Sequence, residues 1–149
     1  MKILIPIDGS KISQKAVLTA KEIGEKFNAK LIILTVIPET SIIEQYPSNF
    51  PYTLEIEKAN TERAEFVLSD VEKALSDYPS EVQTIYTSGN PSQQITKFAE
   101  ENDVDLIVMG NRGLGAFSRT LLGSVSNKVL NHSNVSVLIV KGDIDTDKN

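Results

Sequence analysis

The chain has 149 residues, of which 40% are hydrophobic, and its formal net charge at pH 7 is −5. This length suits a single domain with a buried core, and the absence of cysteine excludes disulfides, thiolate metal sites and a cysteine nucleophile. The acidic balance argues against nucleic acid or an anionic membrane as a partner. No apolar run is as long as a membrane span and no secretory leader is visible, so we expect a cytoplasmic protein.

Hydrophobic periodicity predicts strands and helices in alternation. Continuous branched apolar runs indicate strands buried on both faces, and apolar residues at helical spacing indicate helices with one inner face. In chain order we predict strands over residues 2–7, 30–37, 82–87, 104–108 and 135–140, and helices over residues 11–27, 53–78, from 91 onward and 125–132. This alternation predicts a parallel sheet covered by helices on both faces, with residues 82–87 at an edge.

Local signals mark where the helices begin and which residues they bury. Ser10 or Ser13 is expected to cap the first helix, and Asn90 with Pro91 forms a clear helix start in which Gln93 can complete a capping box. The charged face of the second helix, which includes Arg63, is interpreted as solvated surface. The predicted inner faces comprise Ile12, Ala16, Ala20, Ile23 and Phe27, then Val67, Val71, Ala74, Leu75 and Tyr78, then Ile95, Phe98 and Ala99.

Two segments lack periodicity. Residues 39–52 carry prolines and mixed apolar residues, and a segment of this length is either a lid or cover over a site or a plain surface connection. Residues 143–149 are polar and charged and are predicted to form a flexible tail. We therefore expect one domain over residues 1–142.

The most distinctive stretch joins the strand at residues 104–108 to the helix at residues 125–132. Its glycines allow positive φ angles and the close approach of a ligand, and its helix start presents N–H groups and hydroxyls that suit an anion, above all phosphate. Its arginines match phosphate oxygens. The residues concerned are Gly110, Arg112, Gly113, Gly115, Arg119, Gly123, Ser124, Val125 and Ser126. On chemistry alone an anion site and a plain glycine-rich loop with a capped helix are equal alternatives.

The spacing Gly110-x2-Gly113-x9-Gly123-Ser124 resembles the ATP-binding signature G-x2-G-x9-G-[ST] of the universal stress protein family. The resemblance covers nearly the whole chain, because the other predicted strands stand where that family has its own. It implies an α/β fold with an open five-stranded parallel sheet of order 3-2-1-4-5, similar to the adenine nucleotide alpha hydrolases. In that order the strand ending at Asp8 and the strand ending at Gly110 meet where the order reverses, which is where ligands bind in such sheets.

The resemblance also implies which residues contact ATP. Asp8 would accept a hydrogen bond from the ribose, with a turn or capping residue as the lesser alternative. Val36 would meet the adenine, although it could equally be strand core. Mg²⁺ is expected to be held mostly by phosphate oxygens and water. The implied set is Pro6, Ile7 and Asp8 at the adenosine, Val36 at the adenine, Met109, Gly110, Arg112 and Gly113 with the neighbouring Gly115 around the ribose and first phosphates, and Gly123, Ser124, Val125 and Ser126 at the distal phosphates.

The function implied by this resemblance is that of an ATP-binding regulatory module in stress response. Dimerisation with a second copy through the apolar edge strand Val135–Val140, an unidentified protein partner and at most slow ATP hydrolysis are part of that expectation. The sequence has no P-loop and no G-x-G-x-x-G motif. The lone His132 is interpreted as structural. A nucleotide-free interaction protein of the same fold and a genuine ATPase remain alternatives, as does AMP or another adenylate in place of ATP.

Overall fold

A computed structural model describes residues 1–39, 51–112 and 122–142, with only the backbone described for residues 51–53. Its strands form one five-stranded sheet of order β3-β2-β1-β4-β5 in which every neighbouring pair is parallel. The predicted fold class and strand order are therefore confirmed. The elements are β1 (Lys2–Pro6), α1 (Lys11–Phe27), β2 (Lys30–Pro38), α3 (Pro51–Ala74), β3 (Val82–Gly89), α4 (Pro91–Glu101), β4 (Leu106–Gly110), α5 (Ser124–His132) and β5 (Ser136–Val140).

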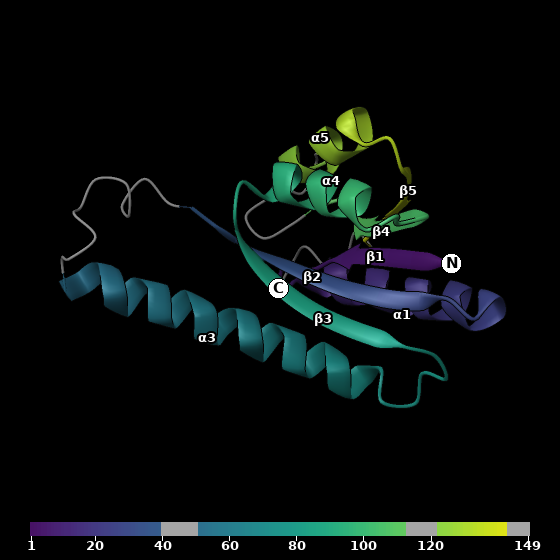
Figure 1. Cartoon of the computed structure of the whole chain (residues 1–149), viewed down its shortest axis with the longest axis horizontal. Coiled ribbons are helices and arrows are strands. Elements are labelled where there is room, and N and C mark those ends of the chain that lie inside the picture. The colour runs from purple at the N-terminus through teal and green to yellow at the C-terminus, as the bar shows by residue number, and fades with distance from the viewer. Residues whose placement is uncertain (40–50, 113–121, 143–149) are drawn as a thin grey trace.

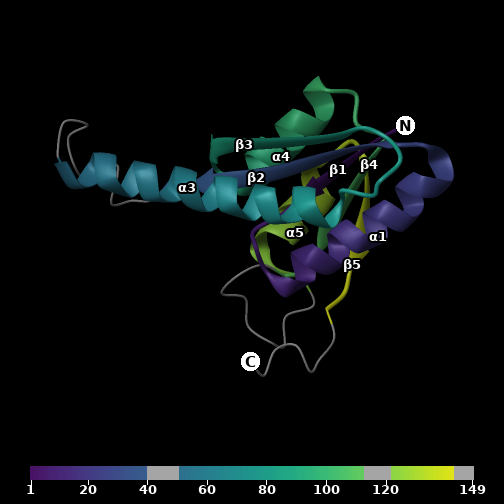
Figure 2. The same cartoon turned by 90° about the horizontal axis from the view of Figure 1, so that it is seen from below.

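Helices cover both faces of the sheet (Figure 1). Helices α1 and α3 pack on one face and α4 and α5 on the other, and Figure 2 shows α1 and α3 together on the face seen from below. Because successive side chains of a strand point to opposite faces, Ile3 and Ile5 join the core beneath α1 and α3, whereas Leu4 joins the core beneath α4 and α5. All three side chains are completely buried.

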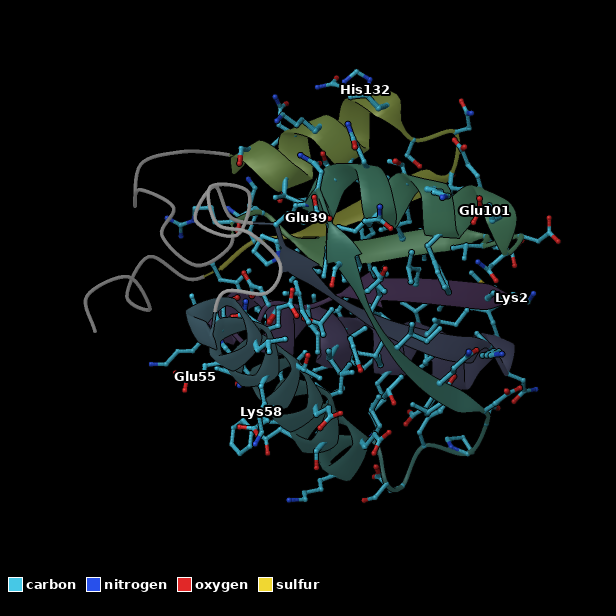
Figure 3. All side chains as sticks on the ribbon, turned by 60° about the vertical axis from the view of Figure 1, so that its left-hand side comes forward. Lys2, Glu39, Glu55, Lys58, Glu101 and His132 are labelled. Carbon is cyan, nitrogen blue, oxygen red and sulfur yellow. The ribbon has the colours of Figure 1, made fainter. Side chains whose placement is uncertain are left out.

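The strands share one direction, so their carboxyl ends lie along a single edge of the sheet. Figure 3 shows this arrangement: Glu39, which follows β2, lies at the opposite end of the sheet from Lys2, which begins β1. The first turns of α3 extend beyond the strands at the carboxyl edge (Figure 1). This overhang adds a wall to that edge.

The predicted helix caps are present. Ser10 caps α1, with its Oγ accepting a hydrogen bond from the Ser13 N–H at 3.2 Å. Asn90 caps α4 in the same way, its Oδ1 accepting from the Gln93 N–H at 3.2 Å, and Pro91 stands at the first position of the helix. Both caps satisfy N–H groups that have no partner inside the helix.

Two residues predicted for inner helix faces are exposed. Phe27 is 63% exposed, because the space beneath the last turns of α1 is filled by Tyr78, whose hydroxyl lies against Gly24 and donates a hydrogen bond to the Ala29 carbonyl. Ala74 is exposed because it lies one step off the buried stripe of α3. That stripe and its continuation run through Ala64, Leu68, Val71, Leu75 and Tyr78.

Two predicted segments fall largely outside the described residues. Residues 40–50 and 143–149 are among those the structure does not describe, so the predicted lid and tail, and the domain boundary at residue 142, stay predictions. Helix α3 begins at Pro51, two residues before the predicted start, and ends at Ala74. No helix within the described ranges is long and apolar enough to cross a membrane.

Candidate functional site

A cavity of about 680 Å³ opens at the carboxyl edge of the sheet. This volume lies within the range of about 300–1,000 Å³ that small-molecule sites occupy. Strands β1, β2 and β4 form its floor, and its walls come from α3 on one side and the starts of α4 and α5 on the other. The cavity therefore lies at the switch point of the strand order, between β1 and β4.

Every predicted site residue that the structure describes lines this cavity. The predictions at Gly113 and Gly115, and the additional cation at Arg119, lie outside the described residues. The residues brought together are Pro6, Ile7, Asp8, Val36, Met109, Gly110, Arg112, Gly123, Ser124, Val125 and Ser126. Segments more than a hundred residues apart in sequence thus meet around one hollow, as parallel strand order requires.

Asp8 has a structural role as well as a place on the cavity surface. Its Oδ1 accepts a hydrogen bond from the Ser10 N–H at 2.9 Å, which stabilises the turn between β1 and α1. Gly9, between the two, has a φ angle of 85°, a conformation that favours glycine. The two interpretations of Asp8 are therefore compatible, since a turn residue also faces the cavity.

The start of α5 forms the most anion-friendly part of the cavity wall. Gly123 precedes the helix, its N–H donates to the Asn111 carbonyl at 2.7 Å, and the first hydrogen bond within the helix runs from the Asn127 N–H to the Gly123 carbonyl at 3.0 Å. The N–H groups of residues 124–126 have no partner inside the helix, because a helix leaves its first donors unpaired. Ser124, Val125 and Ser126 all line the cavity, so these donors are placed for an anion.

The Ser126 hydroxyl is already engaged. Its side chain is 3% exposed, and its Oγ donates a hydrogen bond to the Gly110 carbonyl at 2.8 Å. This bond ties the end of β4 to the first turn of α5. The predicted contact between this hydroxyl and a phosphate stays a prediction, and because the hydroxyl proton is used in this bond, the backbone N–H of Ser126 is the donor left for an anion.

Of the two reasons predicted for Gly110, the positive φ angle is wrong, and the close approach of a ligand stays a prediction. Gly110 does not belong to the described glycines with positive φ, which are Gly9 and Gly89. A Cβ placed at Gly110 would collide with the Ile12 side chain of α1. The glycine therefore allows α1 to pack closely on β4. This contact concerns the packing of the helix and not the approach of a ligand.

The wall formed by α3 was missed by the sequence analysis. Asn60, Arg63, Ala64 and Val67 all line the cavity, although the charged face containing Arg63 had been interpreted as solvated surface. These residues follow the buried stripe of α3 toward its amino end, where the helix passes the sheet. Extending that stripe one or two turns backward from Leu68 is the sequence signal that identifies them.

The remaining lining residues are mainly apolar. They come from the end of β2 and the start of α4, namely Leu34, Thr35, Ile37, Pro38, Pro91 and Ile95, with Ser13 of α1. Val36 is half-buried, packs against the core beneath α4 and α5, and also lines the cavity. Its interpretation as strand core is therefore confirmed, and its contact with adenine stays a prediction. An apolar floor with polar groups at its ends suits a ligand that has a flat apolar part and an anionic part.

The charges around the cavity oppose the charge of the whole protein. Among the described lining residues the charged side chains are Asp8, Arg63 and Arg112, which gives an excess of positive charge on a chain whose net charge is −5. Arg112 is 8% exposed, and Arg63 is exposed. This local excess favours an anionic ligand.

Comparison with known proteins agrees with this geometry. The profile of the universal stress protein family matches residues 1–141. The chain is a member of the universal stress protein family. Universal stress protein MJ0531 of Methanocaldococcus jannaschii is 34% identical over 140 residues, covering 94% of this chain and 81% of that protein. Universal stress protein YxiE of Bacillus subtilis is 33% identical over 145 residues, covering 94% and 98%.

Solved structures of universal stress proteins share the fold. The structure of hypothetical protein MJ0577 superposes with a TM-score of 0.84 at 34% identity, covering 95% of this chain and 96% of that one. A universal stress protein solved in complex with cAMP superposes with a TM-score of 0.70 at 29% identity, covering 94% and 96%. These proteins therefore share the arrangement of strands and helices with this chain although their sequences differ from it at most positions.

Proposed function

We propose that this universal stress protein binds an adenine nucleotide, ATP in the first instance, in the cavity at the carboxyl edge of its sheet. The observation that carries the proposal is the meeting of the described signature residues, Gly110, Gly123 and Ser124, around one cavity with the start of α5. The apolar end formed by β2 suits an adenine ring. The first turn of α5, together with Arg112, suits phosphate oxygens.

A relative adds support for the ligand class. The universal stress protein crystallised with cAMP shares 29% identity with this chain over almost its whole length. Cyclic AMP and ATP have the adenosine and a phosphate in common, so the shared chemistry is an adenine nucleotide. ATP is preferred here because the spacing of the glycine signature resembles the ATP-binding signature of the family, and because the start of α5 and Arg112 place donors and positive charge on the same cavity.

Mg²⁺ would accompany the phosphates without a protein cage. In the described part of the chain no group of three histidine, cysteine or acidic side chains could hold a metal ion. Asp8 is the one carboxylate among the described lining residues. A nucleotide-bound Mg²⁺ keeps most of its ligands as phosphate oxygens and water, and it would supply charge neutralisation to the bound phosphates.

Binding with at most slow hydrolysis is the activity that this lining supports. A fast ATPase needs a group that orients or activates water near the terminal phosphate. Asp8 already accepts the Ser10 N–H and lies at the end of β1. A regulatory protein needs no turnover of its ligand. A ligand that binds only the folded state stabilises that state, and it can shift the protein toward a conformation that offers a different surface to a partner.

The first experiment asks what the protein carries. Protein purified without added nucleotide is heat-denatured, and the released small molecules are identified by chromatography and mass. An adenine nucleotide near one per chain supports the proposal. A protein that carries no nucleotide and also shows no heat of binding with MgATP contradicts the proposal. The hypothesis of a nucleotide-free interaction protein would then be favoured.

The second experiment tests the start of α5. Ser124→Pro removes one N–H donor at the first helical position, where proline is well tolerated, and the ψ angle of 169° at Gly123 suits a following proline. Because hydrogen bonds to charged groups contribute about 1.5–3 kcal/mol, we expect MgATP affinity to fall about tenfold or more. Ser124→Ala, which keeps the N–H, is the matched control and should bind more tightly than the proline variant. Equal affinity in the proline variant and the native protein would contradict this use of the helix start.

We further propose that the protein is a homodimer paired through β5. Among the described residues, β5 pairs only with β4, which leaves its outer edge open, and Leu138 is 37% exposed there. Leu138→Asp should convert a dimer to a monomer in analytical ultracentrifugation. Leu130→Asp, which alters a 43% exposed leucine of α5, should leave the dimer intact. A native protein that is monomeric at high concentration would refute the pairing.

A further inference from the structure

Arg63 lies on α3 one helical turn before the residue that packs on the β1–α1 turn. This residue is Val67, since a Cβ at Gly9 would lie 3.3 Å from the Val67 Cγ2. Residues four apart share a face of a helix, so Arg63 continues the same face beyond the sheet. Arg63 lines the cavity there, as does Asn60, which lies three residues earlier, toward the amino end of α3.

The guanidinium of Arg63 is not committed to an acidic neighbour. Within the described ranges, ion pairs join Lys21 to Asp77, Lys30 to Glu81 and Lys58 to Glu62, and none involves Arg63. The sequence explains this difference. The residues three and four positions from Arg63 are Ala59, Asn60, Phe66 and Val67, and none of them carries a charge.

The other charged side chains described on α3 do not line the cavity. Lys58 is 79% exposed at its side chain and pairs with Glu62 at 4.0 Å. Figure 3 shows Glu55 and Lys58 on the part of α3 near its amino end, and neither lines the cavity. Arg63 is therefore the charged side chain that α3, within its described residues, brings to the cavity.

Arg63 and Arg112 approach the cavity from different elements. Arg112 follows β4 and neighbours the start of α5, whereas α3 packs on the opposite face of the sheet (Figure 1). An anion held at the start of α5 can thus be met by a second cation from across the cavity. Guanidinium groups on long, flexible stems suit this task, because they reach phosphate oxygens and remain charged at every physiological pH.

We propose that Arg63 is a specificity residue that contacts the phosphates of the bound nucleotide from the α3 wall. The inference rests on the proposed nucleotide function and adds to it a residue outside the glycine signature. The contribution of Arg63 to the binding free energy should grow with the charge of the phosphates, and it should vanish for adenosine, which has no phosphate. The residue thereby makes the site prefer ATP over AMP and AMP over adenosine.

The test compares Arg63→Gln with Lys73→Gln by titration calorimetry. Lys73 is also exposed on α3 but does not line the cavity, so its replacement makes the same change in net charge away from the site. We expect Arg63→Gln to weaken MgATP about tenfold, AMP by a smaller factor and adenosine by less than about twofold. Lys73→Gln should change each affinity by less than about twofold. The effect of Arg63→Gln on MgATP should shrink as salt concentration rises.

Several outcomes would overturn the inference. Equal weakening of ATP and adenosine would mean that Arg63 contacts the base or only supports the fold. Unchanged ATP affinity in Arg63→Gln, with a native protein that binds ATP, would refute the role of Arg63 and leave the nucleotide function standing. A native protein that binds none of the three ligands would instead overturn the nucleotide function itself, together with this inference.

Discussion

Two glycines set how closely helices approach the sheet. Gly110 leaves room for Ile12 of α1, and Gly24 leaves room for the Tyr78 hydroxyl. Neither has a positive φ angle, so the requirement is space and not backbone conformation. Gly24 looks costly in a helix when only propensity is considered, but the contact with Tyr78 explains why no larger residue stands there.

Replacing Gly110 tests this steric requirement. Gly110→Ala should lower the free energy of unfolding by about 1–3 kcal/mol, because an extra methyl group in a packed core forces its neighbours to move. Urea unfolding measures the change. In the double variant with Ile12→Ala, part of the loss should be recovered relative to the sum of the single changes. Strict additivity would show that the clash with Ile12 is not the cause.

Tyr78 gives a prediction with a pH dependence. Its hydroxyl donates to the buried Ala29 carbonyl, so Tyr78→Phe should cost about 1–3 kcal/mol of unfolding free energy. Burial raises the pKa of Tyr78 above its ordinary value of 10.0. The folded state therefore favours the neutral phenol, and this stabilisation is complete below pH 10 and lost as pH rises from there toward the folded pKa.

Urea unfolding of the native protein and of Tyr78→Phe, from neutral to strongly alkaline pH, separates the contribution of the Tyr78 phenol to the free energy of unfolding. The pKa of Lys21 is also raised, through its hydrogen bond to Asp77, so the native protein loses stability at alkaline pH for two reasons. The difference between the native protein and Tyr78→Phe isolates the phenol. That difference should narrow above pH 10. A constant difference across the alkaline range would argue against a buried, titrating Tyr78.

For helices and strands, the periodicity of apolar residues was sufficient to predict the element and its buried face wherever that face alone decided its burial. The five strands, the capped starts of α1 and α4 and the edge position of β3 were all predicted. The error at Ala74 came from placing it on the buried stripe of α3, which it lies beside, whereas the error at Phe27 arose because burial at the last turn of a helix depends on what another element places beneath it. No pattern within α1 could show that Tyr78 fills that space.

The candidate site divides in the same way. The place of Gly110, Gly123, Ser124 and the strand ends around one cavity could be predicted, because parallel strand order brings those ends together. The α3 wall could not, because its place depends on how far the helix extends past the sheet, and a charged helical face near Arg63 is usually solvent-exposed. The hydrogen bond from Ser126 to Gly110 likewise depends on a tertiary contact.

The cap of α4 provides a test at this scale. Asn90 accepts hydrogen bonds from the Gln93 N–H at 3.2 Å and the Ser92 hydroxyl at 2.9 Å. Asn90→Ala should lower the free energy of unfolding by about 0.5–2 kcal/mol, and Asn90→Asp, which retains a cap, should lose much less. Thermal unfolding followed by circular dichroism compares them. Equal losses in both variants would mean that the cap oxygen is not what stabilises α4.

The cavity draws on nearly the whole chain, from Pro6 in β1 to Ser126 in α5. A ligand bound there is therefore linked to the folding of the entire domain. At a free concentration of about one hundred times its dissociation constant, such a ligand adds about 2.7 kcal/mol to the free energy of unfolding. For a domain of this size each kcal/mol corresponds to about 2–4 °C.

MgATP should accordingly raise the thermal unfolding midpoint by about 5–10 °C at that saturation. Differential scanning calorimetry measures the shift, and Ser124→Pro at the same nucleotide concentration should show a smaller one. A shift of equal size with MgCl₂ alone would assign the effect to the cation. The absence of any shift would contradict binding to the folded state.

The order in which the cavity's walls leave the ribosome has a consequence for synthesis. The strand ends of β1 and β2 and the wall of α3 emerge first, and β4 and the start of α5 follow them. A growing chain that has not yet reached Ser126 lacks the helix start that offers its N–H groups to an anion. An anion can therefore be held at this end of the cavity only after Ser126 has been made, long after the β1, β2 and α3 parts of the cavity have been translated.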